Sequence, residues 1–151
     1  MKKNFENFKR YALITGAASG MGRIYAQRLA VMGYNVVLVD INAAGLDETE
    51  DMVRKDVQAS VDITGQAKKD FRLIKIVQDL SAMDAADRVY EVTQEHRCEV
   101  EVLVNNAGIM YCQGIAETSE RILRLIMMVH MNTPLMLCRK YVGGMKDRGC
   151  G

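Results

Sequence analysis

Short apolar runs of strand length alternate with longer helical patterns along this 151-residue chain, and this alternation is the feature that most restricts its fold. The run from Val36 to Val39 is apolar on both faces, which is typical of a strand buried inside a parallel sheet. Strands that are each followed by a helix predict right-handed crossovers and an α/β fold with a doubly wound parallel sheet. We expect strands at residues 11–15, 36–39, 73–77 and 100–104 and helices at residues 20–32, 43–57, 84–96 and 118–145.

The chain length and the connections predict one domain over residues 1–151, without a linker or an internal repeat. Residues 58–72 form a longer connection than a tight helix-to-strand turn needs, so we interpret them as an insertion that extends the helix or adds a surface excursion. The last helix contains Pro134, which predicts a bend there.

Composition excludes several classes of protein. The 20 basic and 19 acidic side chains give a net charge of +1, so no basic surplus indicates nucleic-acid binding. No apolar run has the length of a membrane span or a signal peptide, and we therefore expect a cytoplasmic protein. The four cysteines lack CxxC spacing and the two histidines stand apart, which predicts free thiols and no metal site.

A glycine-rich turn, TGAASGMG at residues 15–22, follows the first strand and opens the first helix. Glycines permit a tight turn and a close approach of the backbone to a ligand, and a helix N-terminus attracts an anion. The alternative is an ordinary strand-to-helix turn. The order of strand, turn, helix, strand and acid favours a pyrophosphate site of a dinucleotide.

The acid in this order is Asp40, directly after the second strand. A carboxylate at that position accepts hydrogen bonds from the ribose hydroxyls of NAD and repels the 2′-phosphate of NADP. The turn itself contains no basic residue, so the sequence favours NAD. Arg23, just after the turn, keeps NADP as the second candidate, and a helix-capping or turn role remains the alternative for Asp40.

Three motifs in order resemble those of the classical short-chain dehydrogenase/reductase family. The turn has the spacing TGxxxGxG, the fourth strand closes with NNAG at residues 105–108, and Asn132 lies in the long last helix. The similarity runs from about residue 11 to residue 151, apart from the stretch at residues 58–72. It implies a Rossmann-type sheet with strand order 3-2-1-4, which ends before a fifth strand.

The resemblance also implies a set of cofactor-binding residues. The family uses an aspartate and an apolar residue after the third strand to contact adenine. Asp62 and Asp79 are both candidates, and we choose Asp79 with Leu80 because a clear strand precedes them, although Asp79 also fits a helix N-cap. The full set is Gly16, Ser19, Gly20, Met21 and Gly22 at the pyrophosphate, Asp40, Asp79 and Leu80, and Asn106, Ala107 and Gly108 beside the adenosine ribose.

Two asparagines carry alternative interpretations. Asn106 fits either the cofactor site or a structural tie between neighbouring strands through its amide. The resemblance gives Asn132 a place in a proton relay, where its backbone carbonyl holds a water. The alternative for Asn132 is a polar break in the helix before Pro134.

The family's catalytic serine and its YxxxK pair are absent from these residues, since none of the six tyrosines has a lysine four positions on. We therefore interpret the chain as a truncated NAD(P)-dependent oxidoreductase, inactive on its own, whose full-length relatives act on an alcohol or ketone. The alternative is a non-catalytic dinucleotide-binding or interaction module. We also expect homo-oligomers through the helix from Thr118, which is an interface helix in the family.

Overall fold

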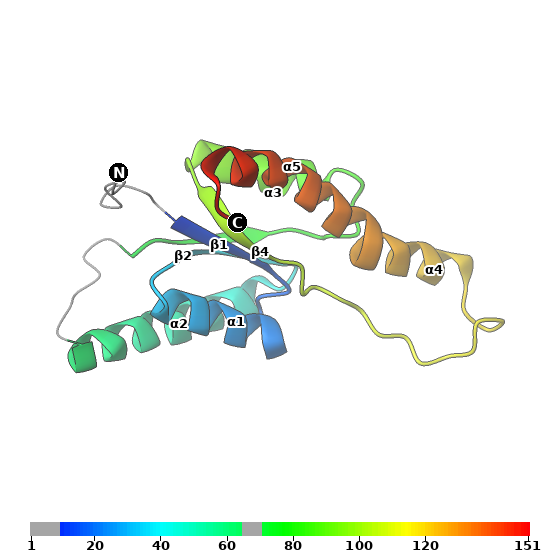
Figure 1. Ribbon diagram of the computed structural model, residues 1–151. Coiled ribbons are helices and arrows are strands. Elements are labelled where there is room, and N and C mark those ends of the chain that lie inside the picture. Colours follow the sequence, from blue (N-terminus) through cyan, green and yellow to red (C-terminus); the bar gives the residue numbers. More distant parts are fainter. Residues whose placement is uncertain (1–9, 65–70) are drawn as a thin grey trace.

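The computed structural model describes residues 10–64 and 71–151, and a four-stranded parallel sheet lies at its centre (Figure 1). The strand order is β3-β2-β1-β4, as the family resemblance implied, and each strand end lies within one residue of the position predicted from the sequence. The strands are β1 (Arg10–Thr15), β2 (Asn35–Asp40), β3 (Leu73–Val77) and β4 (Glu99–Val104). The predicted doubly wound α/β fold is confirmed.

Helices cover both faces of the sheet (Figure 1). One face packs against α1 (Gly20–Val31) and α2 (Ala43–Thr64), and the other packs against α3 (Ala85–Glu95) and α5 (Thr133–Arg148). Neighbouring residues of β1 divide between the two cores: Leu13 lies in the cluster with α3 and α5, whereas Ile14 lies in the cluster with α1 and α2. Because side chains alternate along a strand, the apolar run of β1 supplies both cores at once.

Helix α2 is longer than predicted. The sequence indicated a helix to residue 57, but α2 continues to Thr64, so at least part of the extra stretch at residues 58–72 extends the helix. Val53 and Val57 are buried four residues apart on the side that faces the sheet, and this spacing continues the helix period. Residues 65–70 lie outside the described residues.

The long helix predicted at residues 118–145 is observed as a continuous helical run from Glu120 to Arg148, but its geometry is not regular throughout. It is divided into α4 (Glu120–Met127), a π-helical turn called η2 (Met128–Asn132) and α5. Pro134 has no N–H for the carbonyl of His130, and its ring would collide with that carbonyl in a regular helix. The irregular turn thus lies just before the proline, where the sequence predicted a bend, and widening the helix relieves this conflict.

Helix α4 and the segment that leads into it lie apart from the sheet (Figure 1). The Ser119 hydroxyl accepts a hydrogen bond from Ile122 N at 3.4 Å and caps the helix. None of the α4 residues is buried, although the helix has a distinctly apolar side. Helices α1, α2, α3 and α5 thus pack on the sheet, whereas α4 has no comparable cover among the described residues.

Candidate functional site

The glycine turn joins β1 to α1 and packs closely against the segment that follows β4. Gly16 has a φ of +68°, which favours glycine. A Cβ on Gly22 would lie 2.0 Å from the Gly16 carbonyl oxygen, and a Cβ on Gly16 would lie 2.8 Å from Cα of Ala107. Neither position leaves room for a side chain, so the turn depends on both glycines.

The N-terminus of α1 is open to an anion. Ser19 is its N-cap residue, has extended backbone, and its side chain forms no capping hydrogen bond. The first turn of α1 contains no acidic residue, and Ser19, Gly20 and Met21 are exposed. The first amide groups of a helix have no partner within the helix and carry a partial positive charge. These residues fit a phosphate group well.

Asp40 lies at the end of β2, beside the turn. Its Oδ2 accepts a hydrogen bond from Ala18 N at 3.0 Å, and its Oδ1 accepts one from Asn42 N at 3.0 Å. Asn42, and not Asp40, caps α2, because Asn42 Oδ1 accepts a hydrogen bond from Gly45 N at 3.0 Å. The bond from Asn42 N, two residues along the chain, gives Asp40 the turn role that the sequence left as an alternative. The structure therefore brings the predicted acid and the predicted turn into direct contact.

The NNAG segment at residues 105–108 meets the same turn from the other side. Asn106 Nδ2 donates to the carbonyl oxygens of Thr15 at 3.0 Å and Gly16 at 3.3 Å. The Thr15 hydroxyl accepts hydrogen bonds from the backbone amides of Asn106 and Ala107. Asn106 thus forms the structural tie that the sequence offered as one of its two interpretations, and this tie places Ala107 against the turn.

His130 also contacts the segment after NNAG, and no sequence pattern predicted this contact. Its Nε2 lies 3.0 Å from Ile109 N, which donates to it in one tautomer, and 2.9 Å from Ile109 O. A Cβ on Gly108 would lie 2.9 Å from Cε1 of His130, so the NNAG glycine leaves space for the ring. The imidazole of η2 therefore holds the chain just after NNAG, across a sequence distance that no local pattern reveals.

Asp79 and Leu80 follow β3, as predicted, but they differ in exposure. Asp79 is exposed, and its Oδ1 accepts hydrogen bonds from the backbone and hydroxyl of Ser81 at 2.8 and 2.7 Å. The N-cap of α3 is Asp84, so the capping alternative for Asp79 is wrong. The Leu80 side chain is buried in the core, and its carbonyl accepts a hydrogen bond from Thr133 Oγ1 at 2.8 Å. The rejected candidate, Asp62, lies within α2.

Asn132 is the last residue of η2, and the irregular turn places it between α4 and α5. Its side chain is partly exposed and lines a hollow of about 470 Å³ together with residues of α3 and α5. Single π-helical turns occur frequently at functional sites. The relay role of Asn132 nevertheless stays a prediction.

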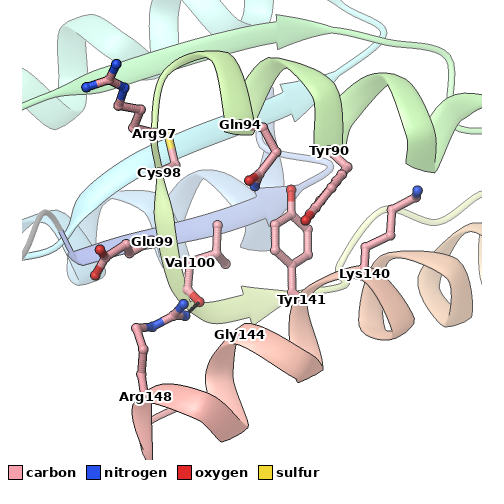
Figure 2. A pocket seen from close by; sticks show the side chains of 10 residues that line it. All are labelled: Tyr90, Gln94, Arg97, Cys98, Glu99, Val100, Lys140, Tyr141, Gly144 and Arg148. Atoms are coloured by element: carbon pink, nitrogen blue, oxygen red, sulfur yellow. Dashed lines mark hydrogen bonds between the residues drawn. The ribbon is translucent and has the colours of Figure 1, made fainter.

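A second hollow, of about 310 Å³, lies between α3 and α5 at the start of β4 (Figure 2). The NNAG segment follows the opposite end of that strand. Tyr141 lies 2.8 Å from the Thr93 hydroxyl, and its ring packs edge-on against Tyr90 at 5.4 Å. Burial raises the pKa of Tyr141, which keeps the phenol neutral. Its neighbour Lys140 pairs with Asp87 at 2.5 Å. These contacts hold α3 against α5, away from the glycine turn.

Within residues 10–64 and 71–151, no helix is long and apolar enough to cross a membrane. The same residues contain no group of three or more His, Cys, Asp or Glu side chains that could hold a metal ion.

Comparison with known proteins agrees with this geometry. The short chain dehydrogenase family matches residues 10–151. An uncharacterized oxidoreductase of Thermotoga maritima is 31% identical over 148 residues, which cover 98% of this chain and 52% of that protein. A diacetyl reductase [(S)-acetoin forming] of Staphylococcus epidermidis is 33% identical over 72% of this chain and 37% of its own length. The chain thus spans about half or less of these curated relatives.

Solved structures show the same fold. A metagenomic short-chain oxidoreductase in complex with NADP has a TM-score of 0.77 and 26% identity, over 95% of this chain and 60% of its own. A bulky-bulky ketone specific alcohol dehydrogenase of Comamonas testosteroni has a TM-score of 0.77 and 25% identity, over 93% of this chain and 51% of its own. Sheet order, glycine turn and family match agree, and this chain belongs to the short-chain dehydrogenase/reductase family.

Proposed function

We propose that this chain is the cofactor-binding part of an NAD-dependent oxidoreductase that interconverts an alcohol and a ketone. The observation that carries the proposal is the meeting of an open helix N-terminus with a carboxylate at one end of the sheet, where Ala18 N donates to Asp40 Oδ2 at 3.0 Å. A pyrophosphate matches the helix N-terminus by its negative charge, and the neighbouring ribose matches the carboxylate by its hydroxyl groups. The cofactor accepts or supplies the hydride when bound.

The chain's own residues bind and orient the adenosine half in this proposal. Ser19, Gly20, Met21 and Gly22 present the α1 N-terminus to the pyrophosphate, and Gly16 allows the close approach. Asp40 accepts hydrogen bonds from the ribose hydroxyls. The remaining predicted contacts are Asp79 and Leu80 at adenine, and Ala107 and Gly108 along the ribose, next to the tie that Asn106 forms.

Contacts of Arg23 support NAD over NADP. Its guanidinium donates to the Ala18 carbonyl at 2.5 Å, to Thr49 Oγ1 at 2.9 Å and to Glu48 at 2.9 Å. These bonds engage the arginine nearest to the turn with the chain itself, while Asp40 remains beside the ribose position. A 2′-phosphate would then meet the Asp40 carboxylate without a free guanidinium to neutralise it.

Catalysis requires more than these 151 residues supply in our proposal. A hydride donor beside a carbonyl still needs a positioned group that exchanges a proton with the substrate oxygen. No tyrosine of the sequence has a lysine four positions on, and the buried Tyr141 is engaged with Thr93. Asn132 contributes a relay position only. The alcohol and ketone class rests on the names of the diacetyl reductase and the ketone-specific dehydrogenase.

Titration of NADH and NADPH by fluorescence tests this proposal. We expect weak binding, with NADH bound more tightly than NADPH, and no turnover of alcohols or ketones by the 151-residue chain. Tighter binding of NADPH would refute the assignment of Asp40. Reproducible cofactor-dependent turnover would refute the view that the acid–base group lies outside these residues.

A further inference from the structure

A fully buried hydroxyl on α2 contacts the backbone of the glycine turn. Thr49 is 0% exposed, and its Oγ1 lies 2.9 Å from the Ala17 carbonyl oxygen. The same Oγ1 accepts a hydrogen bond from Arg23 Nε at 2.9 Å. It also lies 2.9 Å from the Gly45 carbonyl, so its single proton is shared between two acceptors. The contact with Gly45 is the common bond of a helical threonine to the carbonyl four residues earlier, whereas the contacts with Ala17 and Arg23 join α2 to the glycine turn and α1.

The peptide group between Ala17 and Ala18 links this hydroxyl to the acid. In a planar trans peptide, the carbonyl of one residue and the N–H of the next point in opposite directions. The Ala17 carbonyl points toward Thr49, and the Ala18 N–H therefore points away from it, toward Asp40 Oδ2 at 3.0 Å. One rigid group thus connects a buried side chain of α2 with the carboxylate at the end of β2.

Arg23 holds the next carbonyl along the turn. Its guanidinium donates to Ala18 O and is itself fixed by Thr49 and Glu48. A Cβ on Gly45 would lie 2.8 Å from Cβ of Ala18, so α2 also packs directly against the turn. Two successive carbonyls are therefore held on the α2 side, which leaves the α1 N-terminus and Asp40 facing the ligand side.

We infer that Thr49, together with Arg23, is a positioning residue that sets the orientation of the Ala17–Ala18 peptide and thereby the placement of Asp40 for the ribose. The expected effect on ligand binding rests on the proposed function. The arrangement itself is a property of the chain without any ligand, and it can be measured separately.

The first test measures the peptide directly. Amide hydrogen exchange by NMR is compared for the wild type, Thr49→Val, Thr49→Ser and Thr93→Val. Thr93 is a matched control, because it is also 0% exposed and hydrogen-bonded but lies on the other face of the sheet. We expect the Ala18 amide, relative to β1 core amides, to exchange roughly tenfold faster in Thr49→Val only. Equal Ala18 protection in Thr49→Val and Thr93→Val would overturn the inference.

The second test measures binding with ADP-ribose, which needs only the adenosine half of the site. We expect Thr49→Val to weaken ADP-ribose roughly tenfold, Thr49→Ser to restore it, and Thr93→Val to leave it unchanged. Unchanged affinity in Thr49→Val would also overturn the inference. If the wild type fails to bind ADP-ribose, the proposed function fails, while the exchange measurement still decides the positioning role. Should Thr49→Val not fold, Arg23→Met is measured instead, with the exposed Arg28→Met as its control.

Discussion

The glycine turn and the α4 arm, which we define as residues 109–132, are opposite cases within one chain. At the turn, side chains from α1, α2 and the NNAG segment hold successive backbone groups, and two missing Cβ atoms make the fit possible. In the arm, α4 contains no buried residue, and Met127 and Met131 are 53% and 50% exposed. The arm joins the rest of the molecule where η2 packs against α5, with Val129 buried, whereas the hydrogen bonds between His130 and Ile109 lie within the arm itself.

The chain's own contacts fix the conformation of the turn, whereas they leave surfaces of α4 and β4 uncovered. In our proposal, ligand recognition at the turn uses backbone groups that the chain's own contacts orient, so it is a local property of the fold. The apolar side of α4 has no comparable cover among the described residues, and β4 has a strand neighbour only on its β1 side there. Unpaired strand edges and uncovered apolar helices favour association with other chains.

The largest expected effect concerns the turn. Gly22→Val places a side chain where the Gly16 carbonyl lies 2.0 Å away, so the turn must open. We expect nucleotide affinity measured by calorimetry to fall by a factor on the order of one hundred or more, since the backbone can no longer approach the phosphate. Gly143→Ala is the control, because a Cβ there meets no atom within 4 Å. Unchanged affinity in a folded Gly22→Val protein would show that the turn is not the phosphate site.

A smaller effect is expected at the acid. Asp40→Ser removes a charged acceptor that also fixes Ala18 and Asn42. We expect the ratio of NADH to NADPH affinity to fall by roughly tenfold to a hundredfold, because hydrogen bonds to charged groups are worth about 1.5–3 kcal/mol. Fluorescence titration of both cofactors measures this ratio. A ratio equal to that of the wild type would mean that another residue selects the cofactor.

The helix that follows the arm provides the next comparison. Leu135, the third residue of α5, is 61% exposed, and we propose that it lies in an interface between copies of this chain. Leu135→Glu should weaken self-association about tenfold, because burying a leucine is worth about 1.5 kcal/mol or more. Chromatography with light scattering over a concentration series measures the effect, with Met32→Glu, 72% exposed at the end of α1, as control. A sharp wild-type monomer peak at every concentration would remove the basis for this prediction.

The smallest effect is expected between α3 and α5. Tyr141→Phe removes the hydrogen bond to Thr93, at a cost of about 1 kcal/mol in the free energy of unfolding. Because burial raises the pKa of Tyr141, the unfolded chain loses its phenolic proton before the folded one does. Wild-type stability should therefore fall as the pH rises above 10, and the phenylalanine variant should lack this contribution. Denaturant unfolding of both proteins from pH 8 to pH 11 tests the difference, and parallel curves would contradict it.

Local patterns account for the part of the fold that the sequence predicted. The apolar runs set the four strands, and the glycine spacing together with Asp40 identified two segments that the structure brings into contact. The π-helical turn escaped prediction because Pro134 indicates a disturbance but not its form. The contacts of His130 and Thr49 escaped it because each joins segments distant in sequence, and only packing shows which backbone group a polar side chain reaches.

The central claim is that this chain by itself holds the adenosine half of an NAD site, and an NMR titration tests it most directly. ADP-ribose and nicotinamide mononucleotide are added separately to the labelled 151-residue chain. The account predicts saturable shifts for ADP-ribose at the amides of Gly16 to Gly22 and at Asp40, and no saturable shifts for nicotinamide mononucleotide. Saturation by nicotinamide mononucleotide, or ADP-ribose shifts confined to residues outside the turn and the ends of β2, β3 and β4, would contradict it.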